Sequence, residues 1–295
     1  MKKRITRNLI AMMLCFAVVA TAIGCGAQEK TATTPAPEES SEEAVAAEPA
    51  VAATEETTDA PSDDGDKYKG SLAGTTLTIG TDVSFVPFEF PDENDVYTGF
   101  DMDLISAMSE YLGFEYTLTP MDFTAMLMSV QTSKLDVGIA GITMTDEREE
   151  VMDFSDPYYD AGIQILVKED SDIDSFDDLT DKTLAIKEGT ASLTYVEEHF
   201  PDAKVVTFAT IDEAYLEVQR GAADATVFDA PNMLYFVKTN PDCGCKVVGD
   251  LEDACQYGIL FPAGSTNKEF FDAALAKFKT DGTYDAIYDK WFGTN

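Results

Sequence analysis

Short apolar runs alternate with longer amphipathic stretches along residues 74–294. The apolar runs predict strands over 76–80, 136–142, 163–167, 183–186, 224–228 and 257–261. Between them, apolar residues recur at helical spacing, for example at Leu104, Ile105, Met108 and Leu112 and again over 123–130. Two last helices are predicted on either side of residues 281–282. This alternation predicts an α/β protein with largely parallel sheets.

The two halves of this region begin alike. Residues 74–80 and 181–190 each contain a predicted strand, and each is followed by a second strand, at 136–142 or 224–228. We therefore expect two lobes built on one plan, with polar residues just beyond the carboxyl ends of their strands, where open α/β sheets hold ligands. Lobe 1 is predicted over 70–157 and 258–295, and lobe 2 over 163–251. The crossings at 158–162 and 252–257 are predicted to form a two-strand hinge.

The amino terminus has the pattern of a secretory signal peptide. Residues 9–23 carry no charge and follow a basic start with Lys2, Lys3, Arg4 and Arg7. This run is short for a membrane span, which needs about 20 residues. It ends in Ala22-Ile23-Gly24-Cys25, which resembles the bacterial lipobox. Residues 1–24 are therefore predicted to be a lipoprotein signal peptide and Cys25 to be lipidated; an ordinary cleaved signal and an uncleaved anchor are the alternatives.

Residues 25–69 are predicted to be a disordered, acidic tether. They are rich in Ala, Thr, Pro, Ser and Glu and have almost no large apolar side chains, so they cannot bury enough surface to fold. The formal net charge of the whole chain is −35, and most of it falls on the predicted folded part. Nucleic acid is therefore not expected as a partner.

The cysteines predict neither a disulfide framework nor a metal site. Cys15 lies in the predicted signal peptide, which leaves the odd number Cys243, Cys245 and Cys255 besides Cys25. The chain has one histidine, and the Cys-Gly-Cys spacing is not that of a zinc site. A structural role is expected for the three, with a redox role or a disulfide left open. No metal and no cofactor is predicted.

Several sequence motifs in a fixed order resemble one protein family. They are TDVSFVPFEF (81–90), GFDMDL (99–104), AGITMTDER (140–148), DFS (153–155), GTY (282–284) and KWFG (290–293). Over residues 74–294 the chain resembles the extracellular polar amino acid binding proteins of ATP-driven importers, solute-binding protein family 3, and within them the bacterial glutamine-binding proteins. The resemblance implies a periplasmic-binding-protein-like α/β fold with two lobes and no enzymatic activity.

The resemblance also implies which residues bind a free amino acid. Arg148 matches the position whose guanidinium holds the α-carboxylate through a two-pronged pair. Asp229 matches the anion that meets the α-ammonium from the other lobe. Without the family, Arg148 would be interpreted as a surface ion pair and Asp229 as a turn residue. Phe85 and Phe123 match the rings that sandwich the aliphatic stem of the ligand. Three further positions match helpers of the carboxylate site: Ala140, Gly141 and Thr143.

Thr190 begins a predicted helix, so backbone N–H groups near Thr190 and Ala191 are expected to face the same carboxylate. A simple helix cap is the alternative. The glutamine-binding relatives often have glycine where this chain has Ala191. The main-chain donor at Ala191 is lost only if a left-handed backbone is needed there.

Ligand choice is expected to depend on Asp82 and Lys187. In glutamine-binding relatives these two positions take opposite ends of the side-chain amide. A glutamate ligand would place a second carboxylate against Asp82, and a lysine or arginine ligand would place a cation against Lys187. Those relatives often have histidine where this chain has Phe228. Asparagine, histidine or another polar amino acid is therefore the alternative to glutamine.

The sequence thus predicts a lipid-anchored, monomeric binding protein that captures a polar amino acid in a closing cleft and delivers it to an ABC importer. It is expected on the outer face of the plasma membrane, with periplasmic anchoring as the alternative. A small cyclic-acid dehydratase and a sensory receptor on the same fold are the rival functions.

Overall fold

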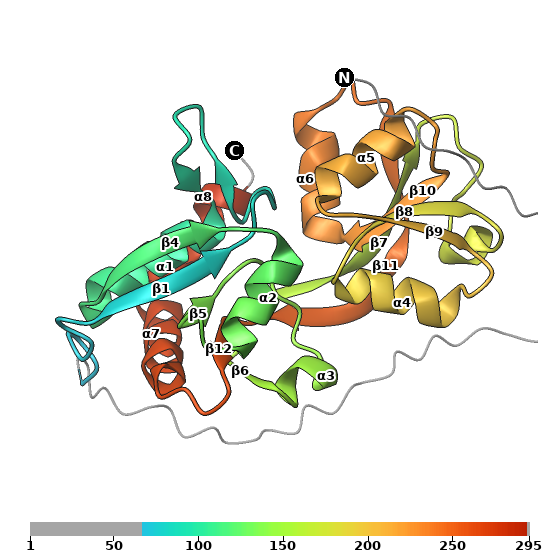
Figure 1. Ribbon diagram of the computed structural model, residues 1–295. Helices are drawn as coiled ribbons and strands as arrows, with labels where there is room; N and C mark the ends of the chain where they lie inside the picture. Colours follow the sequence, from blue (N-terminus) through green and yellow to red (C-terminus); the bar gives the residue numbers. More distant parts are fainter. Residues whose placement is uncertain (1–66, 294–295) are drawn as a thin grey trace, which may run out of the picture. The chain divides into compact units, whose positions relative to one another are not determined.

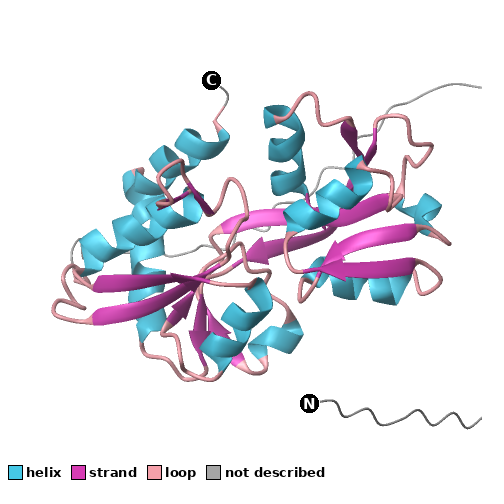
Figure 2. Ribbon diagram, turned by 45° about the horizontal axis from the view of Figure 1, so that its top comes forward, coloured by secondary structure: helices cyan, strands magenta, loops and turns pink. Residues whose placement is uncertain are grey.

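A computed structural model describes residues 67–293, in which the strands form two five-stranded sheets and one two-stranded ribbon (Figures 1 and 2). The predicted signal peptide, the lipidation site at Cys25 and nearly all of the predicted tether lie outside the described residues. In the described residues, no helix has the length and apolar character needed to cross a membrane.

The first sheet has the strand order β4-β1-β5-β12-β6. Its strands are β1 (Thr76–Thr81), β4 (Glu115–Pro120), β5 (Val137–Gly138), β6 (Met152–Phe154) and β12 (Leu260–Pro262). The ribbon pairs β2 (Phe90–Pro91) with β3 (Tyr97–Thr98). The helices of this lobe are α1 (Phe100–Leu112), α2 (Phe123–Gln131), α3 (Asp146–Glu149), α7 (Asn267–Asp281) and α8 (Thr283–Phe292).

The second sheet has the strand order β11-β7-β10-β8-β9. Its strands are β7 (Tyr159–Lys168), β8 (Thr183–Lys187), β9 (Lys204–Phe208), β10 (Ala225–Asp229) and β11 (Cys245–Tyr257). The helices of this lobe are α4 (Ala191–His199), α5 (Ile211–Gln219), α6 (Ala230–Thr239) and the short 3₁₀ helix Phe176–Leu179. The predicted fold class, with two lobes that each hold a sheet flanked by helices, is confirmed.

The predicted helices follow their apolar periodicity. In α1, Leu104, Ile105, Met108 and Leu112 are all fully buried, as their spacing predicts. The helix ends where Gly113 takes the left-handed conformation at φ 84°, a common way to terminate a helix. The last two predicted helices are α7 and α8, and the left-handed Gly282 (φ 84°) separates them.

The prediction of largely parallel sheets is wrong, because half of the strand pairs in each sheet are antiparallel. β1 pairs in parallel with β4 and β5, and β8 with β9 and β10. The antiparallel pairs involve β12 in the first sheet and β7 in the second. Both strands enter their sheet from the other lobe and not through a helical crossover, which is the connection that makes neighbouring strands parallel.

Two predicted strands are corrected. Residues 257–261 are not one strand: β11 ends at Tyr257 in the second sheet and β12 begins at Leu260 in the first. Residues 136–142 form a strand only at Val137–Gly138, because Gly141 has a φ of 53° and the chain turns away from the sheet. The residues that leave the sheet after β5 form part of the pocket described below.

The residues predicted as a hinge begin β7 and end β11. In the second sheet Tyr159 pairs with Tyr257 and Ala161 with Cys255. The chain thus crosses between the sheets on two adjacent antiparallel segments (Figure 1). That these segments flex stays a prediction.

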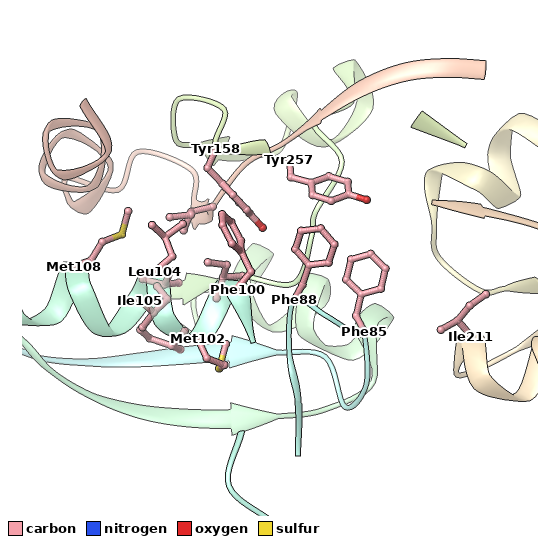
Figure 3. Close-up of a cluster of buried hydrophobic side chains, with 14 of the residues drawn as sticks. Phe85, Phe88, Phe100, Met102, Leu104, Ile105, Met108, Tyr158, Ile211 and Tyr257 are labelled. Carbon is pink, nitrogen blue, oxygen red and sulfur yellow. The ribbon is translucent and has the colours of Figure 1, made fainter. Parts of the chain in front are cut away.

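Aromatic residues fill the core where the two crossings meet lobe 1. Phe88, Phe100 and Tyr257 are fully buried, and Phe88 stacks on Phe85 with ring centroids 4.9 Å apart. Figure 3 shows Phe85, Phe88 and Phe100 side by side with the rings of Tyr158 and Tyr257. Close packing of these rings fixes the backbone segments from which the pocket is built.

Candidate functional site

A small cavity lies between residues of the two lobes. Its walls come from the carboxyl ends of β1, β5, β8 and β10 and from the first residues of α2 and α4, as expected for ligand sites of open α/β sheets. It is lined by Phe85, Phe123, Ala140, Gly141, Thr143, Arg148, Lys187, Thr190, Ala191, Phe228 and Asp229. Ten of the eleven residues predicted to bind ligand are in this lining; the other, Asp82, lies behind Lys187.

Arg148 is held in the cavity wall by hydrogen bonds to both lobes. It lies on α3, whose first turn is capped by the hydroxyl of Thr145. Its Nη1 donates to the carbonyl of Thr143 at 2.6 Å, and its Nη2 donates to the carbonyl of Gly189 at 3.0 Å. Burial lowers the pKa of Arg148, whereas the nearby Asp229 raises it. An arginine stays protonated in such surroundings, so the wall carries a fixed positive charge with three further N–H donors.

Asp229 supplies a negative charge to the same cavity. It ends β10 and is only 8% exposed. Its Oδ2 accepts a hydrogen bond from the hydroxyl of Tyr257 at 2.8 Å. Burial raises the pKa of Asp229 to about 6, against the lowering effects of the Tyr257 hydrogen bond and of the charges on Lys187 and Arg148. A cation placed in the cavity would stabilise the ionised form.

Lys187, which lines the cavity, forms a buried ion pair with Asp82. Lys187 is 2% exposed and Asp82 1% exposed, and Nζ donates to Oδ2 of Asp82. The Lys187 ammonium also lies 5.2 Å from the ring centre of Phe123, 5.7 Å from that of Phe228 and 5.9 Å from that of Phe85. Cation–π attraction to three rings and the paired carboxylate together hold the ammonium in place. The sequence predicted the two charged residues and the rings of Phe85 and Phe123 as ligand contacts. It noted Phe228 only as a position where glutamine-binding relatives often have histidine.

Phe85 and Gly141 form a tightly packed part of the wall. Phe85 is fixed by a turn in which its N–H donates to the carbonyl of Glu89 at 2.7 Å. A Cβ atom at position 141 would overlap the Phe85 ring, and the φ of Gly141 is +53°. Only glycine satisfies both requirements without strain.

The amino terminus of α4 faces the cavity. Thr190 is its cap, and the Thr190 hydroxyl accepts from the N–H of Leu193 at 3.2 Å while donating to the carbonyl of Lys187 at 2.8 Å. The left-handed residue of this loop is Gly189, with φ 72°, and Ala191 is the first helical residue. Alanine at 191 is therefore compatible with the loop. The N–H groups of a first helical turn have no partner within the helix and suit an anion.

The three cysteines among the described residues are unpaired. Cys255 lies beside the cavity, with its Sγ 4.0 Å from the hydroxyl oxygen of Thr143. Burial raises the pKa of Cys255 to about 12 and that of Cys245 to about 11. Because the thiolate is the reactive form, these two thiols are poor nucleophiles.

Replacing Gly189 with alanine is expected to weaken ligand binding about tenfold or more. An added Cβ would overlap the Thr124 hydroxyl on α2 of the other lobe, and a left-handed alanine costs about 1–2 kcal/mol. Calorimetry of the variant with the ligand of the wild type measures the effect. Gly264→Ala is the matched control, because Gly264 is also left-handed (φ 77°) but has open space around its Cβ position. Equal losses of affinity in the two variants would show that the contact of the added Cβ with Thr124 of the other lobe does not weaken binding.

Sequence reasoning missed several residues that support the site. Tyr257 was predicted to lie in a strand, but its hydrogen bond to Asp229 was not predicted. No local sequence pattern relates two residues that are 28 positions apart. Outside the cavity, Nδ2 of the buried Asn232 donates to the carbonyl of Val86 at 2.5 Å, which joins α6 to the segment after β1. The hydroxyl of Ser84 donates to Asp212 Oδ2 at 2.9 Å in the same region. These contacts hold the two lobes together beside the ligand residues.

Comparison with known proteins gives the family. The model of the bacterial extracellular solute-binding proteins, family 3, matches residues 77–294. The chain is 30% identical over 227 residues to the ABC transporter arginine-binding protein 1 of Escherichia coli (strain K12), covering 76% of this chain and 93% of that protein. It is 31% identical over 219 residues to the ABC transporter glutamine-binding protein GlnH of Bacillus subtilis (strain 168), covering 72% and 79%.

The fold agrees with solved structures of such proteins. An ancestral arginine-binding protein bound to arginine is 42% identical, with a TM-score of 0.72, and covers 74% of this chain and 98% of its own. A second solved structure, of an ancestral arginine-binding protein bound to glutamine, has a TM-score of 0.71 at the same identity and coverage. The two curated relatives differ by only one percentage point in identity, so relatedness alone does not favour glutamine over arginine. The fold is periplasmic-binding-protein-like, and the chain belongs to the bacterial extracellular solute-binding proteins, family 3.

Proposed function

We propose that this protein is a lipid-anchored receptor that captures free glutamine and delivers it to an ABC importer. The observation that carries the choice of ligand is the buried ion pair between Asp82 and Lys187, the latter in the cavity wall. The relatives, named as arginine-, glutamine-, histidine- or cystine-binding proteins, support the wider class of amino acid ligands.

The charges of the cavity fit the constant part of an amino acid. Arg148 and Asp229 line the same cavity and carry opposite charges. The guanidinium suits the α-carboxylate, since a two-pronged charged hydrogen bond is both strong and directional. N–H groups at the start of α4 add to this site, and Asp229 receives the α-ammonium.

The other end of the cavity fits a side-chain amide. The ammonium of Lys187 donates to the amide oxygen, and Asp82 accepts from the amide nitrogen. Lys187 and Asp82 are already paired in the structure. The ligand amide would insert between them, with its oxygen facing the Lys187 donor and its NH₂ group facing the Asp82 acceptor. The rings of Phe85 and Phe123 enclose the aliphatic stem and remove it from water.

Charge distinguishes the rival ligands. An arginine or lysine side chain would bring a second cation against Lys187, which is held by one carboxylate and three rings. A glutamate side chain would bring a second anion against Asp82. Unpaired charge in a buried site costs several kcal/mol, so a neutral polar side chain is preferred.

Delivery requires that the ligand favour one arrangement of the lobes. Arg148 and Asp229 lie in different lobes, and the predicted hinge consists of the two segments at the start of β7 and the end of β11. A ligand that touches both lobes stabilises the closed form, because only differential contact shifts such an equilibrium. The monomer is then held near its importer by a diacyl anchor on Cys25, whose two chains suffice for stable attachment.

Calorimetry of the purified protein against glutamine, asparagine, histidine, arginine, lysine, glutamate and cystine tests the proposal. Glutamine is expected to bind most tightly, with a binding free energy of about −8 kcal/mol, which corresponds to micromolar affinity. A tighter interaction with arginine or glutamate would reject glutamine while leaving amino acid binding in place. No binding to any of the seven would reject the function itself.

Glutamine binding is expected to weaken about tenfold between pH 7.5 and pH 5. The pKa of Asp229 is raised to about 6, so below that pH the carboxyl group holds a proton that must leave before the α-ammonium can pair with it. Each pH unit below the pKa then lowers the apparent affinity about tenfold. Calorimetry at the two pH values measures the change. In Asp229→Asn the remaining affinity should depend much less on pH, and an unchanged slope in this variant would assign the effect to another group.

A further inference from the structure

Two buried acidic side chains lie beneath the cavity and take no part in holding the proposed ligand. Glu89 and Asp101 are both fully buried and lie within hydrogen-bonding reach of each other. Within residues 67–293, no N–H or O–H group donates to either carboxyl oxygen of Glu89 or to Oδ1 of Asp101. Two ionised carboxylates without donors would be strongly unfavourable in such a place. One proton carried by one of the two acids would form a hydrogen bond between two of these three oxygens.

The second oxygen of Asp101 holds two parts of the site. Its Oδ2 accepts from the backbone N–H of Gly141 at 3.0 Å and from the hydroxyl of Tyr158 at 2.9 Å. Gly141 lines the cavity, and Tyr158 directly precedes β7, where the chain crosses to the other lobe. Figure 3 shows Tyr158 among the buried rings beside Phe100 and Tyr257.

The backbone of Glu89 holds the other side of the wall. Its carbonyl closes the turn that fixes Phe85, and the Glu89 N–H donates back to the carbonyl of Phe85 at 3.1 Å. Because Phe85 packs directly against Gly141, the two acids connect both segments of this wall. The pair also reaches Asp229: the N–H of Tyr158 donates to the carbonyl of Tyr257, whose hydroxyl donates to Asp229.

The surroundings favour a proton on the pair. Burial, and then the charge of Asp101, raise the pKa of Glu89 well above its usual value. Burial raises the pKa of Asp101 to about 7. The other ionisable groups that act on the pair are Asp82 at the end of β1, Lys187 on β8, and the phenols Tyr97 on β3, Tyr158 before β7 and Tyr284 on α8. Only Lys187 among them is a cation, and its charge is also paired with Asp82.

We propose that Glu89 keeps a proton at neutral pH and donates it in a hydrogen bond to Asp101, and that this acid pair positions the ligand cavity by fixing Gly141 and Tyr158. The protonated Glu89 satisfies Oδ1 of Asp101. The ionised Asp101 then has its full acceptor strength for the two donors at Oδ2. Glu89 and Asp101 are therefore positioning residues, since neither lines the cavity.

Chemical unfolding without ligand tests the shared proton. The folded protein keeps a proton on Glu89 that the unfolded chain releases near pH 4.5, so this contribution to stability is complete in acid and is lost as the pH rises toward the raised pKa. Over pH 6 to 8, the unfolding constant of the wild type should therefore rise about tenfold more per pH unit than that of Glu89→Gln, which donates without titrating. Equal slopes in the two proteins would overturn the shared proton.

Measurements of ligand affinity test the positioning role. This experiment rests on the proposed amino acid binding, whereas the unfolding experiment does not. Glu89→Leu, which has no donor, is expected to lose about tenfold in affinity at pH 7.5, and Glu89→Gln is expected to recover most of that loss. Tyr158→Phe, which keeps the ring, should weaken binding a few-fold to about tenfold. Tyr116→Phe on the edge strand β4 is the control and should bind as the wild type does.

The ligand results separate the possible failures. Equal affinities of Glu89→Leu and Glu89→Gln would overturn the positioning role. If Glu89→Leu does not fold, Tyr158→Phe decides: wild-type affinity in that variant overturns the role, and the predicted loss supports it. If the wild type binds no amino acid, the proposed function fails, and the difference in unfolding slopes still decides whether the pair shares a proton.

Discussion

Arg148→Ala and Asp229→Ala are each expected to weaken glutamine binding by about 2–5 kcal/mol, which is roughly 30-fold to several thousand-fold. Each change leaves one charged end of the bound amino acid in a buried site without its partner. The cavity cannot replace the lost contact with water at low cost, because Asp229 is only 8% exposed and Arg148 is bonded across both lobes. Calorimetry of the two variants gives the affinities directly.

Matched controls are available for both charges. Arg220, whose side chain is 59% exposed, forms a local pair with Glu217, and Arg220→Ala should bind glutamine normally. Asp170 has a side chain that is 82% exposed, and Asp170→Ala should also bind normally. Thermal unfolding of every variant separates a lost contact from a lost fold. Wild-type affinity in both Arg148→Ala and Asp229→Ala would mean that the cavity is not the ligand site.

Lys187→Met is expected to reverse the choice of ligand from glutamine to arginine. The change removes the cation and leaves Asp82 buried with no ionic partner, which costs about 3–5 kcal/mol of stability. A guanidinium entering the cavity supplies the missing positive charge and meets the rings that now surround the Lys187 ammonium. Chemical unfolding with and without about 1 mM arginine measures the loss of stability and its recovery by the ligand, and calorimetry measures arginine binding.

A double variant distinguishes charge from volume in this prediction. Asp82→Asn combined with Lys187→Met removes both charges, so the protein should regain stability relative to Lys187→Met alone and should not gain arginine binding. Lys134→Met, at an exposed position, is the control for the substitution itself. Continued preference for glutamine over arginine in Lys187→Met would show that Lys187 does not set the specificity.

Much of the fold could be predicted from the sequence, because local periodicity determines it. α1 and α2 have their apolar residues at helical spacing, and α7 and α8 are separated at the predicted glycine. The strands β1, β8 and β10 lie within a residue of their predicted bounds. The exposed edge strands β4 and β9 were not predicted, since their residues lack the continuous apolar run of a buried strand.

The errors occurred where the chain passes from one lobe to the other. An apolar run such as 257–261 has the same appearance whether it stays in one sheet or changes sheets. Gly258 marks the change: its N–H donates to the carbonyl of Ile142, and a Cβ there would lie 2.8 Å from Phe154. Local patterns also could not predict that β7 and β12 run antiparallel to their neighbours, because this depends on the lobe from which the preceding segment comes.

The types of the site residues were visible in the sequence motifs, but their partners were not. The sequence names a cation at 187 and an anion at 82, which are 105 residues apart along the chain. It does not show that three rings, two of them predicted as ligand contacts, surround that cation, or that the hydroxyl of Tyr257 bonds to Asp229. The roles assigned to the ten cavity residues stay predictions until binding is measured.

The sequence by itself determined the alternation of buried strands with amphipathic helices, the acidic character of the chain, and the motifs that identify the family. These depend on the periodicity and chemistry of neighbouring residues. Only the tertiary structure decided which charges meet. Packing brings the ends of β1, β5, β8 and β10 to one cavity, and burial then sets the ionisation of groups such as Glu89 and Asp101, because desolvation depends on distant segments that no local pattern specifies.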